Sequence, residues 1–300
     1  MENILSEIKI KCPWMEILEN EPMSLHCSFR IGGPVRAMIF PESIDDISGL
    51  CAILRSNGVK PMIVGKGTNL LVTDSPLNRI IIMTEKLCGI EKSDTQISAE
   101  CGISLAKLAV FAQENGLAGL EFAHGIPGSL GGAVSMNAGA YGGEMKDVIV
   151  SVTFLDGELN LCAAETEDLN FSYRHSAFSD TDKFILKGVL RLTPDNPIYI
   201  RTRMEELMTK RRTSQPLDKP SAGSTFKRPA SGYAAAMIDE AGLRGFSVGG
   251  AAVSEKHAGF VVNLGDASFC DIRKVMEHIQ DTVYSKFGVR LEPEVKIVEN

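Results

Sequence analysis

The chain has 300 residues, of which 44% are hydrophobic and 23% are charged. This balance is typical of globular proteins with buried cores and excludes a mostly disordered chain. No apolar run reaches the about 18 residues of a membrane-spanning helix, and the N-terminal residues lack the pattern of a signal peptide. The formal net charge of −7 argues against a nucleic-acid partner, which usually requires a basic surface. We therefore expect a soluble, cytoplasmic protein that binds neither membranes nor nucleic acid.

Cysteine and histidine spacing gives no sign of a metal centre. The seven cysteines are scattered, no C-x-x-C pair occurs, and the five histidines form no H-E-x-x-H pattern. Neither a zinc site nor a disulfide framework is indicated. We expect most of the cysteines to be buried, reduced side chains, and we predict no bound metal.

Hydrophobic periodicity divides the chain into three predicted units, in line with its length. The first, residues 1–84, should contain a loosely packed helical arm, a helix over 44–57 and short strands at 36–40, 62–64, 70–72 and 80–83. The second, residues 85–212, should contain a helix over 104–115, a second helix opening at Pro197 and strands at 96–100, 148–155, 159–162 and 184–192. The third, residues 213–300, should contain helices over 234–241 and 268–287 and a closing strand over 289–298.

Two glycine-rich loops are the strongest chemical signals in the sequence. Gly65 and Gly67 lie between two predicted strands, and closely spaced glycines let several backbone N–H groups approach a phosphate. The spacing matches neither a Rossmann fingerprint nor a Walker A loop, so an ordinary turn explains it equally well. The second loop, residues 125–143, is denser in glycine, and its alternative is a set of tight turns between closely packed elements. Together the loops indicate one long dinucleotide.

Lys210, Arg211 and Arg212 form the only dense basic cluster. It is explained either by a solvated helix end, where cations complement the helix dipole, or by a local anion site.

Five segments in this order resemble one bacterial enzyme family: VGKGTNLLV, EFAHGIPGSLGGAVSMNAGAYGGE, FSYRHSAF, PSAGSTFKRP and LEPEVKIV. The chain resembles the UDP-N-acetylenolpyruvoylglucosamine reductases over residues 24–298. The segment after Tyr173-Arg174 is short, as in the shorter type of this family. The resemblance implies an α+β fold, with a two-part FAD-binding region of the p-cresol-methylhydroxylase type and a C-terminal α/β substrate-binding domain.

The resemblance also implies roles for particular residues. Arg174, Ser224 and Glu294 match the family's catalytic arginine, its proton donor and its catalytic glutamate. Tyr141, Tyr173 and Lys227 match positions near the substrate. The residues that match the positions holding non-covalent FAD come from both loops: Gly65, Gly67, Thr68, Asn69, Gly125, Pro127, Gly128 and Ser129.

The implied reaction is NADPH-dependent reduction of the enolpyruvyl ether of UDP-N-acetylglucosamine to UDP-N-acetylmuramate, a peptidoglycan precursor, by a monomeric enzyme. An arginine suits the carboxylate on which charge develops, because its guanidinium binds a carboxylate bidentately. Two alternatives remain. The chain could be another flavoprotein oxidoreductase of the same FAD-binding superfamily, or a non-catalytic nucleotide-binding protein on the same scaffold.

Overall fold

The fold is taken from a computed structural model that describes residues 2–299. The chain clusters into two compact units, and each is built from separate stretches. Unit 1 contains the N-terminal stretch up to Glu19, Ala37–Lys66 and Arg79–Thr209, and unit 2 contains Asn20–Arg36, Gly67–Asn78 and the chain from Lys210 onward. The division into three domains at residues 84 and 212 stays a prediction.

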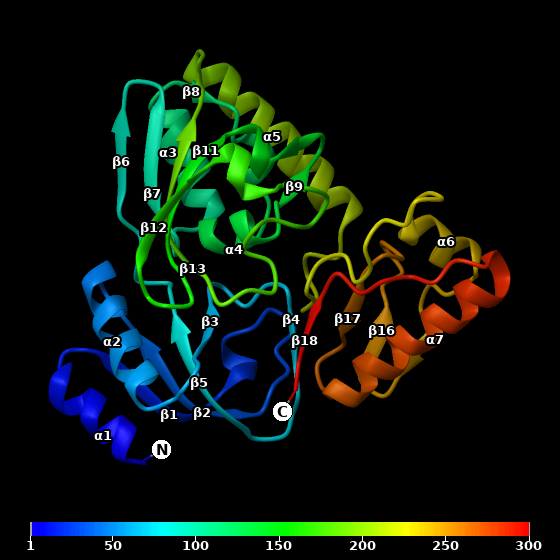
Figure 1. The fold of residues 1–300 in the computed structure, drawn as a ribbon. Helices are drawn as coiled ribbons and strands as arrows, with labels where there is room; N and C mark the ends of the chain where they lie inside the picture. The colour runs from blue at the N-terminus through cyan, green and yellow to red at the C-terminus, as the bar shows by residue number, and fades with distance from the viewer. Residues whose placement is uncertain (1, 300) are drawn as a thin grey trace. The chain divides into compact units, whose positions relative to one another are not determined.

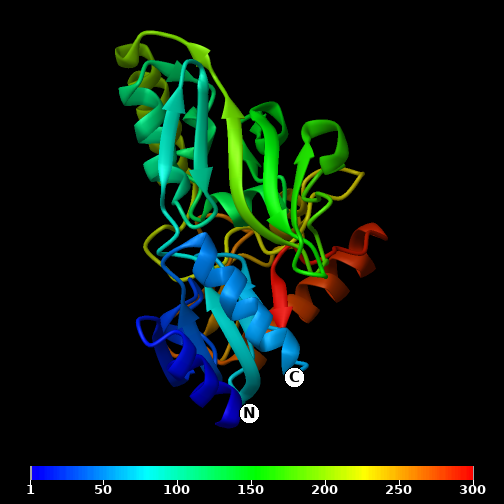
Figure 2. The same ribbon diagram turned by 60° about the vertical axis from the view of Figure 1, so that its left-hand side comes forward.

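The first part of unit 1 combines two helices with a four-stranded sheet. Its elements are α1 (Glu2–Lys11), β1 (Glu16–Pro22), β2 (Pro34–Phe40), α2 (Ile44–Ser56), β3 (Met62–Val64) and β5 (Leu77–Met83), with the sheet order β1-β2-β5-β3. Ser43 and Asp46 form a capping box that starts α2. Ile4 and Ile8 are buried in the core, and α1 contacts α2. The expectation of a loosely packed arm is therefore wrong, because α1 packs beside α2 (Figure 2) and its apolar side chains lie in this core.

The second part of unit 1 is a five-stranded antiparallel sheet with the order β12-β11-β13-β7-β6. Figure 1 shows α3 and α4 beside this sheet. The elements of this part are β6 (Ile90–Ser93), β7 (Gln96–Glu100), α3 (Leu105–Glu114), β8 (Leu117–Ala118), α4 (Leu130–Ser135), β9 (Gly139–Ala140), β10 (Gly143–Glu144), β11 (Ile149–Leu155), β12 (Leu161–Glu165), β13 (Phe184–Arg191), β14 (Thr193–Pro194) and α5 (Pro197–Ser214), which runs on into unit 2.

Unit 2 packs the long helix α7 against a three-stranded sheet, as Figure 1 shows. Its elements are β4 (Leu70–Val72), α6 (Ala234–Glu240), β15 (Ser247–Val248), β16 (Ala251–Val253), β17 (Val261–Asn263), α7 (Phe269–Phe287) and β18 (Lys296–Val298). Ser268 and Asp271 form a capping box at the start of α7. The predicted closing strand over 289–298 is too long, because the strand is limited to β18, which pairs in parallel with β4, and Pro293 forms only an isolated bridge with Phe226.

The core of unit 2 needs all three of its stretches. Phe29 and Ile31 come from the first stretch, Leu71 from the second, and the apolar face of α7 from the third. Four short 3-10 helices lie among the described residues of both units: Met23–Leu25, Glu121–Ala123, Met145–Asp147 and Thr166–Leu169. No helix within residues 2–299 is both long enough and apolar enough to cross a membrane.

Candidate functional site

Gly65 of the first glycine loop and Ser129 of the second meet in unit 1. Gly65 follows β3 and Ser129 precedes α4, and a Cβ atom added at Gly65 would collide with the Ser129 hydroxyl. The second loop is fixed to the start of α3, because the Gly128 carbonyl accepts a hydrogen bond from the Leu105 N–H at 3.1 Å. Gly65 of the first predicted phosphate loop and Ser129 of the second are therefore in contact.

The glycines of these loops are also required by the fold itself. Gly67 has a φ of +57°, and a Cβ there would collide with the His26 carbonyl. Its own carbonyl accepts a hydrogen bond from the Ser28 N–H at 3.1 Å. Gly128 has a φ of +150°, which residues other than glycine rarely adopt. A substitution at either glycine would strain the backbone whether or not a ligand is bound.

The first loop nevertheless has the donors that an anionic cofactor needs. Within the described part of the chain, the N–H groups of Lys66 and Gly67 have no hydrogen-bond acceptor. The Ser129 side chain is 2% exposed and makes no capping bond to α4, although Ser129 occupies the N-cap position. Unused backbone donors and a buried hydroxyl with no capping role are groups suited to the pyrophosphate of a dinucleotide such as FAD.

Arg174 lies on a tight turn in unit 1. Ser172 and His175 exchange two backbone hydrogen bonds of 3.0 and 3.2 Å across the turn, and Arg174 has a φ of +55°. Its guanidinium lies 5.1 Å from the centre of the Tyr173 ring, and its Nη2 donates to the Gly139 carbonyl at 3.4 Å. A positive φ at a residue other than glycine costs free energy and is typical of functional turns.

Tyr141 occupies the tip of the small hairpin formed by β9 and β10. Tyr141 and Gly142 have φ values of +52° and +89°, the left-handed conformations that two-residue hairpin turns favour. The same hairpin supplies the Gly139 carbonyl that accepts from Arg174. The structure therefore brings the Tyr141 hairpin and the Tyr173-Arg174 turn together in unit 1, and both tyrosine side chains are exposed.

Asn137 is a residue of this region to which the sequence analysis gave no role. Its side chain is 1% exposed, and its amide nitrogen donates to the Ser172 carbonyl at 3.0 Å and to Glu144 Oε2 at 2.8 Å. Its Oδ1 accepts from the Lys146 N–H at 3.0 Å. Asn137 lies inside the glycine-rich motif, but nothing in the sequence pattern marks it as functional. Only its contact with Ser172, 35 residues away, indicates a role.

Ser224 and Glu294 lie on neighbouring segments of unit 2. The Glu294 N–H donates to the Thr225 carbonyl at 2.8 Å, and Phe226 and Pro293 form a bridge. Thr225 is 2% exposed and its N–H donates to the Gly259 carbonyl, whereas Ser224 beside it is exposed. The buried, hydrogen-bonded Thr225 thus fixes the position of Ser224, which is exposed.

Lys227 and Asn69 contact the same C-terminal segment in unit 2. The Lys227 N–H donates to the Glu292 carbonyl at 2.8 Å, and its Nζ lies 3.5 Å from Glu292 Oε2. Asn69, predicted to hold the cofactor, uses its side-chain amide within the protein, because it donates to the Glu294 carbonyl at 3.0 Å. The remaining predicted cofactor positions, Thr68, Gly125 and Pro127, belong to the two loops described above.

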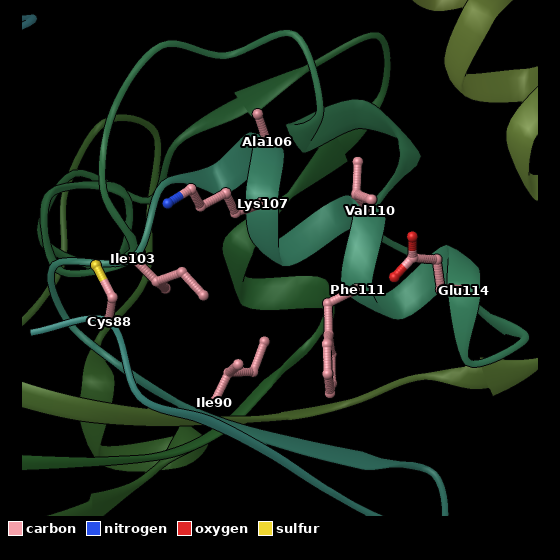
Figure 3. Close-up of a pocket in the computed structure, with 8 residues that line it drawn as sticks. All are labelled: Cys88, Ile90, Ile103, Ala106, Lys107, Val110, Phe111 and Glu114. Atoms are coloured by element: carbon pink, nitrogen blue, oxygen red, sulfur yellow. The ribbon is translucent and has the colours of Figure 1, made fainter.

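A separate apolar hollow of about 440 Å³ opens on α3. Figure 3 shows Ile90, Ile103 and Phe111 lining it, with Lys107 and Glu114 on the helix at its edge. None of the predicted site residues lines this hollow. No group of three or more histidine, cysteine or acidic side chains within residues 2–299 is arranged to hold a metal ion.

The glycine loops and the sheets that carry them define a class of protein. Residues 35–159 match the model of the FAD-binding domain family. A solved structure of alkyldihydroxyacetonephosphate synthase covers 65% of this chain with a TM-score of 0.50 and 14% identity, which is a likeness of fold alone. The class is therefore a FAD-binding flavoprotein, and the predicted α+β fold class is confirmed.

The particular family follows from the rest of the chain. Residues 215–298 match the model of the UDP-N-acetylenolpyruvoylglucosamine reductase C-terminal domain. The enzyme of that name from Caldanaerobacter subterraneus subsp. tengcongensis is 47% identical over 93% of this chain and 92% of its own length, and that from Syntrophomonas wolfei is 43% identical over 98% of both. The crystal structure of the Thermus caldophilus enzyme has a TM-score of 0.80 and 29% identity, and covers 95% of this chain and 99% of its own. The chain belongs to the UDP-N-acetylenolpyruvoylglucosamine reductase family, which confirms the resemblance read from the sequence.

Proposed function

We propose that this protein is a FAD-dependent reductase that uses NADPH to convert the enolpyruvyl ether of UDP-N-acetylglucosamine to UDP-N-acetylmuramate. The observation that carries the proposal is the family membership over almost the whole chain, together with arginine, serine and glutamate at the three matching positions. When bound, FAD carries a hydride from NADPH to the enolpyruvyl double bond.

The two loops are proposed to hold FAD. The N–H groups of Lys66 and Gly67 and the Ser129 hydroxyl are the donors that support this role. Gly65, Gly67 and Gly128 contribute the close backbone approach, and Thr68, Asn69, Gly125 and Pro127 complete the loops. Gly65 and Ser129 are in contact within unit 1, which supports a role for both residues in the same site.

Arg174 is proposed to bind the substrate carboxylate. As the double bond is reduced, negative charge moves into this carboxylate, and a guanidinium fixed in advance stabilises that charge. The positive φ of Arg174 and its bond to the Gly139 carbonyl support a side chain that is held in place rather than left mobile. Tyr141 and Tyr173, both exposed beside this turn, are proposed to contact the substrate.

Ser224 is proposed to deliver a proton to the carbon next to the carboxylate. A hydroxyl is a weak acid, but geometry replaces acidity when the acceptor is a strong carbon base. Ser224 is exposed, so solvent can return the proton, and Glu294 on the bridged segment is proposed to assist that return. Lys227 is proposed to bind the substrate phosphates.

The protein is further proposed to work as a monomer in the cytoplasm. Its cysteines are free thiols, including the exposed Cys270, which supports a reducing compartment. Sedimentation of the purified protein and cell fractionation test these two points.

Anaerobic stopped-flow spectroscopy tests the function. NADPH should bleach the flavin absorbance, and the enolpyruvyl substrate should restore it with formation of UDP-N-acetylmuramate. A purified protein that is reduced by NADPH but is not reoxidised by this substrate would point to another oxidoreductase of the same class. A protein that binds no flavin at all would rule out both.

A further inference from the structure

We propose that Asn137 is a positioning residue for the reaction: it fixes the turn that carries Arg174. The inference rests on the proposed function, in which Arg174 binds the substrate carboxylate.

The Arg174 turn needs support from outside itself. Arg174 has a φ of +55°, and a left-handed conformation costs a residue with a side chain about 1–2 kcal/mol. Across the turn, Ser172 and His175 exchange two backbone hydrogen bonds. Tyr173 at the turn is exposed. Contacts with other segments must therefore determine where the guanidinium lies.

Asn137 supplies such a contact with full use of its side chain. The nitrogen of its amide donates to the Ser172 carbonyl and to Glu144, and the oxygen accepts from the Lys146 N–H. At 1% exposure, an amide without these partners would be costly, so all of these bonds are strongly favoured. One side chain thus ties the base of the catalytic turn to the β10 segment.

The flanking residues of Asn137 hold the chain on the other side of the turn. The Ser135 carbonyl accepts hydrogen bonds of 2.8 Å from the hydroxyls of both Ser176 and Ser179, and the Gly139 carbonyl accepts from Arg174 itself. The stretch that follows α4 therefore contacts the turn before, at and after Arg174. Asn137 is the member of this stretch that acts through its side chain, which makes it the one that substitution can test.

The variant Asn137→Gly removes the side chain and keeps the backbone, because glycine readily adopts the φ of +44° found at Asn137. We expect reoxidation by the enolpyruvyl substrate to slow about 10- to 100-fold, the loss typical of a misplaced catalytic group. The substrate should also bind more weakly to the oxidised enzyme, as measured by its perturbation of the flavin spectrum. Flavin content and reduction by NADPH should not change.

Asn170→Gly is the matched control. Asn170 also has a left-handed backbone, at φ +46°, its side chain also bonds a backbone carbonyl, and it lies two residues before Ser172. It is exposed and its side-chain amide donates to the Asp168 carbonyl rather than to the turn, so this variant should behave as the wild type does.

A double-mutant cycle with Arg174→Lys separates positioning from general stability. If Asn137 acts through Arg174, Asn137→Gly should cost little in the Arg174→Lys background, whereas independent effects would multiply. Multiplying effects, equal slowing of both half-reactions or loss of flavin would overturn the inference. If Asn137→Gly does not fold, Asn137→Asp is used instead, because it keeps the size of the side chain and the acceptor for the Lys146 N–H. The same half-reaction rates, flavin content and double-mutant cycle then test the inference. A wild-type enzyme that the substrate does not reoxidise would instead overturn the proposed function.

Discussion

The side-chain amide of Asn69 donates a hydrogen bond to the backbone carbonyl of Glu294 at 3.0 Å. The Asn69 carbonyl also accepts from the Lys296 N–H at 2.9 Å, so Asn69 is bonded on both sides of Val295. A residue expected to serve the cofactor therefore also places the segment that carries a proposed catalytic carboxylate. Its position at the start of β4, the partner of β18, explains how one residue can do this.

Asn69→Ala should therefore destabilise unit 2 and leave the Glu294 carbonyl without this donor. Loss of one partner of a half-buried hydrogen bond costs about 1–3 kcal/mol. Urea unfolding of the flavin-free protein measures this loss independently of the cofactor. Unchanged unfolding together with a large loss of FAD affinity would instead show that the Asn69 amide serves the cofactor.

Ser129→Ala should weaken FAD binding without unfolding the protein. The hydroxyl makes no capping bond to α4, and a hydrogen bond to a charged group contributes about 1.5–3 kcal/mol, a tenfold to hundredfold change in Kd. Ser104→Ala is the control, because Ser104 accepts from the Lys107 N–H as the N-cap of α3. The control should lower the Tm but keep the FAD affinity. If the Ser129 variant behaves like this control, Ser129 has only a structural role.

Ser224→Ala should separate the two half-reactions. Reduction by NADPH requires no proton donor for carbon and should persist, whereas reoxidation by the enolpyruvyl substrate should slow about 10²- to 10⁴-fold. Ser224→Cys retains a proton at a similar position and should recover part of the loss. Stopped-flow traces of each half-reaction provide the measurement. If reoxidation keeps its rate in the alanine variant, the proton comes from another group, and Glu294→Gln is the next variant to measure.

Lys227→Ala should raise KM for the UDP-sugar about tenfold with a smaller effect on kcat, because the lost contact exists before and during the reaction. Glu292→Gln removes the carboxylate that lies 3.5 Å from Lys227 Nζ and should lower KM or leave it unchanged. Lys210→Ala, an exposed lysine of α5, is the control and should have no effect on KM. A higher KM for the Lys210 variant than for the Lys227 variant would reverse the assignment.

Acid should destabilise unit 2 through His257. Burial lowers the pKa of His257 below its ordinary 6.5, and the Gly259 N–H donates to its Nδ1 at 3.2 Å. Below pH 6.5 the unfolded chain therefore binds more protons than the folded one, so stability is full above this pH and falls as the pH drops through the lowered pKa.

His257→Asn should remove this dependence, because an amide oxygen can accept the same bond without titrating. Urea unfolding at pH values between about 5 and 7.5, across the ordinary histidine pKa, measures the difference between the variant and the wild type. If the free energy of unfolding depends on pH in the same way in the variant and in the wild type, another group is responsible. Because the Gly259 carbonyl accepts from Thr225, acid should also slow the reaction step that uses Ser224.

Local patterns in the sequence predicted those elements that local interactions determine. The helix α7 was predicted because its apolar residues recur at helical spacing, and a capping box of Ser268 and Asp271 satisfies its first N–H groups. The strand β6 was missed: three of its four residues are exposed and polar, and only its pairing with β7 identifies it. The closing strand was predicted too long, because the apolar residues on either side of Pro293 pack into the core of unit 2 and, outside β18, form only the isolated bridge between Phe226 and Pro293.

The candidate site divides in the same way. Its residues were identified because their types and order match a family, and the two glycine loops could be expected to approach each other. The contact of Asn137 with Ser172 joins residues 35 positions apart through one buried amide, and no periodicity indicates it. The use of Asn69 to hold Glu294 spans 225 positions and was equally hidden.

The assembly of unit 2 from three stretches has a consequence for synthesis of the chain. Phe29 and Leu71 leave the ribosome long before α7 and β18, the elements against which they pack. These apolar side chains must remain exposed, or be shielded by a chaperone, while almost all of the remaining chain is translated. A separately produced fragment of residues 210–300 should likewise unfold without a cooperative transition, because it lacks both the core residues and the partner strand. Unit 2 therefore reaches its folded state only after β18 has been synthesised.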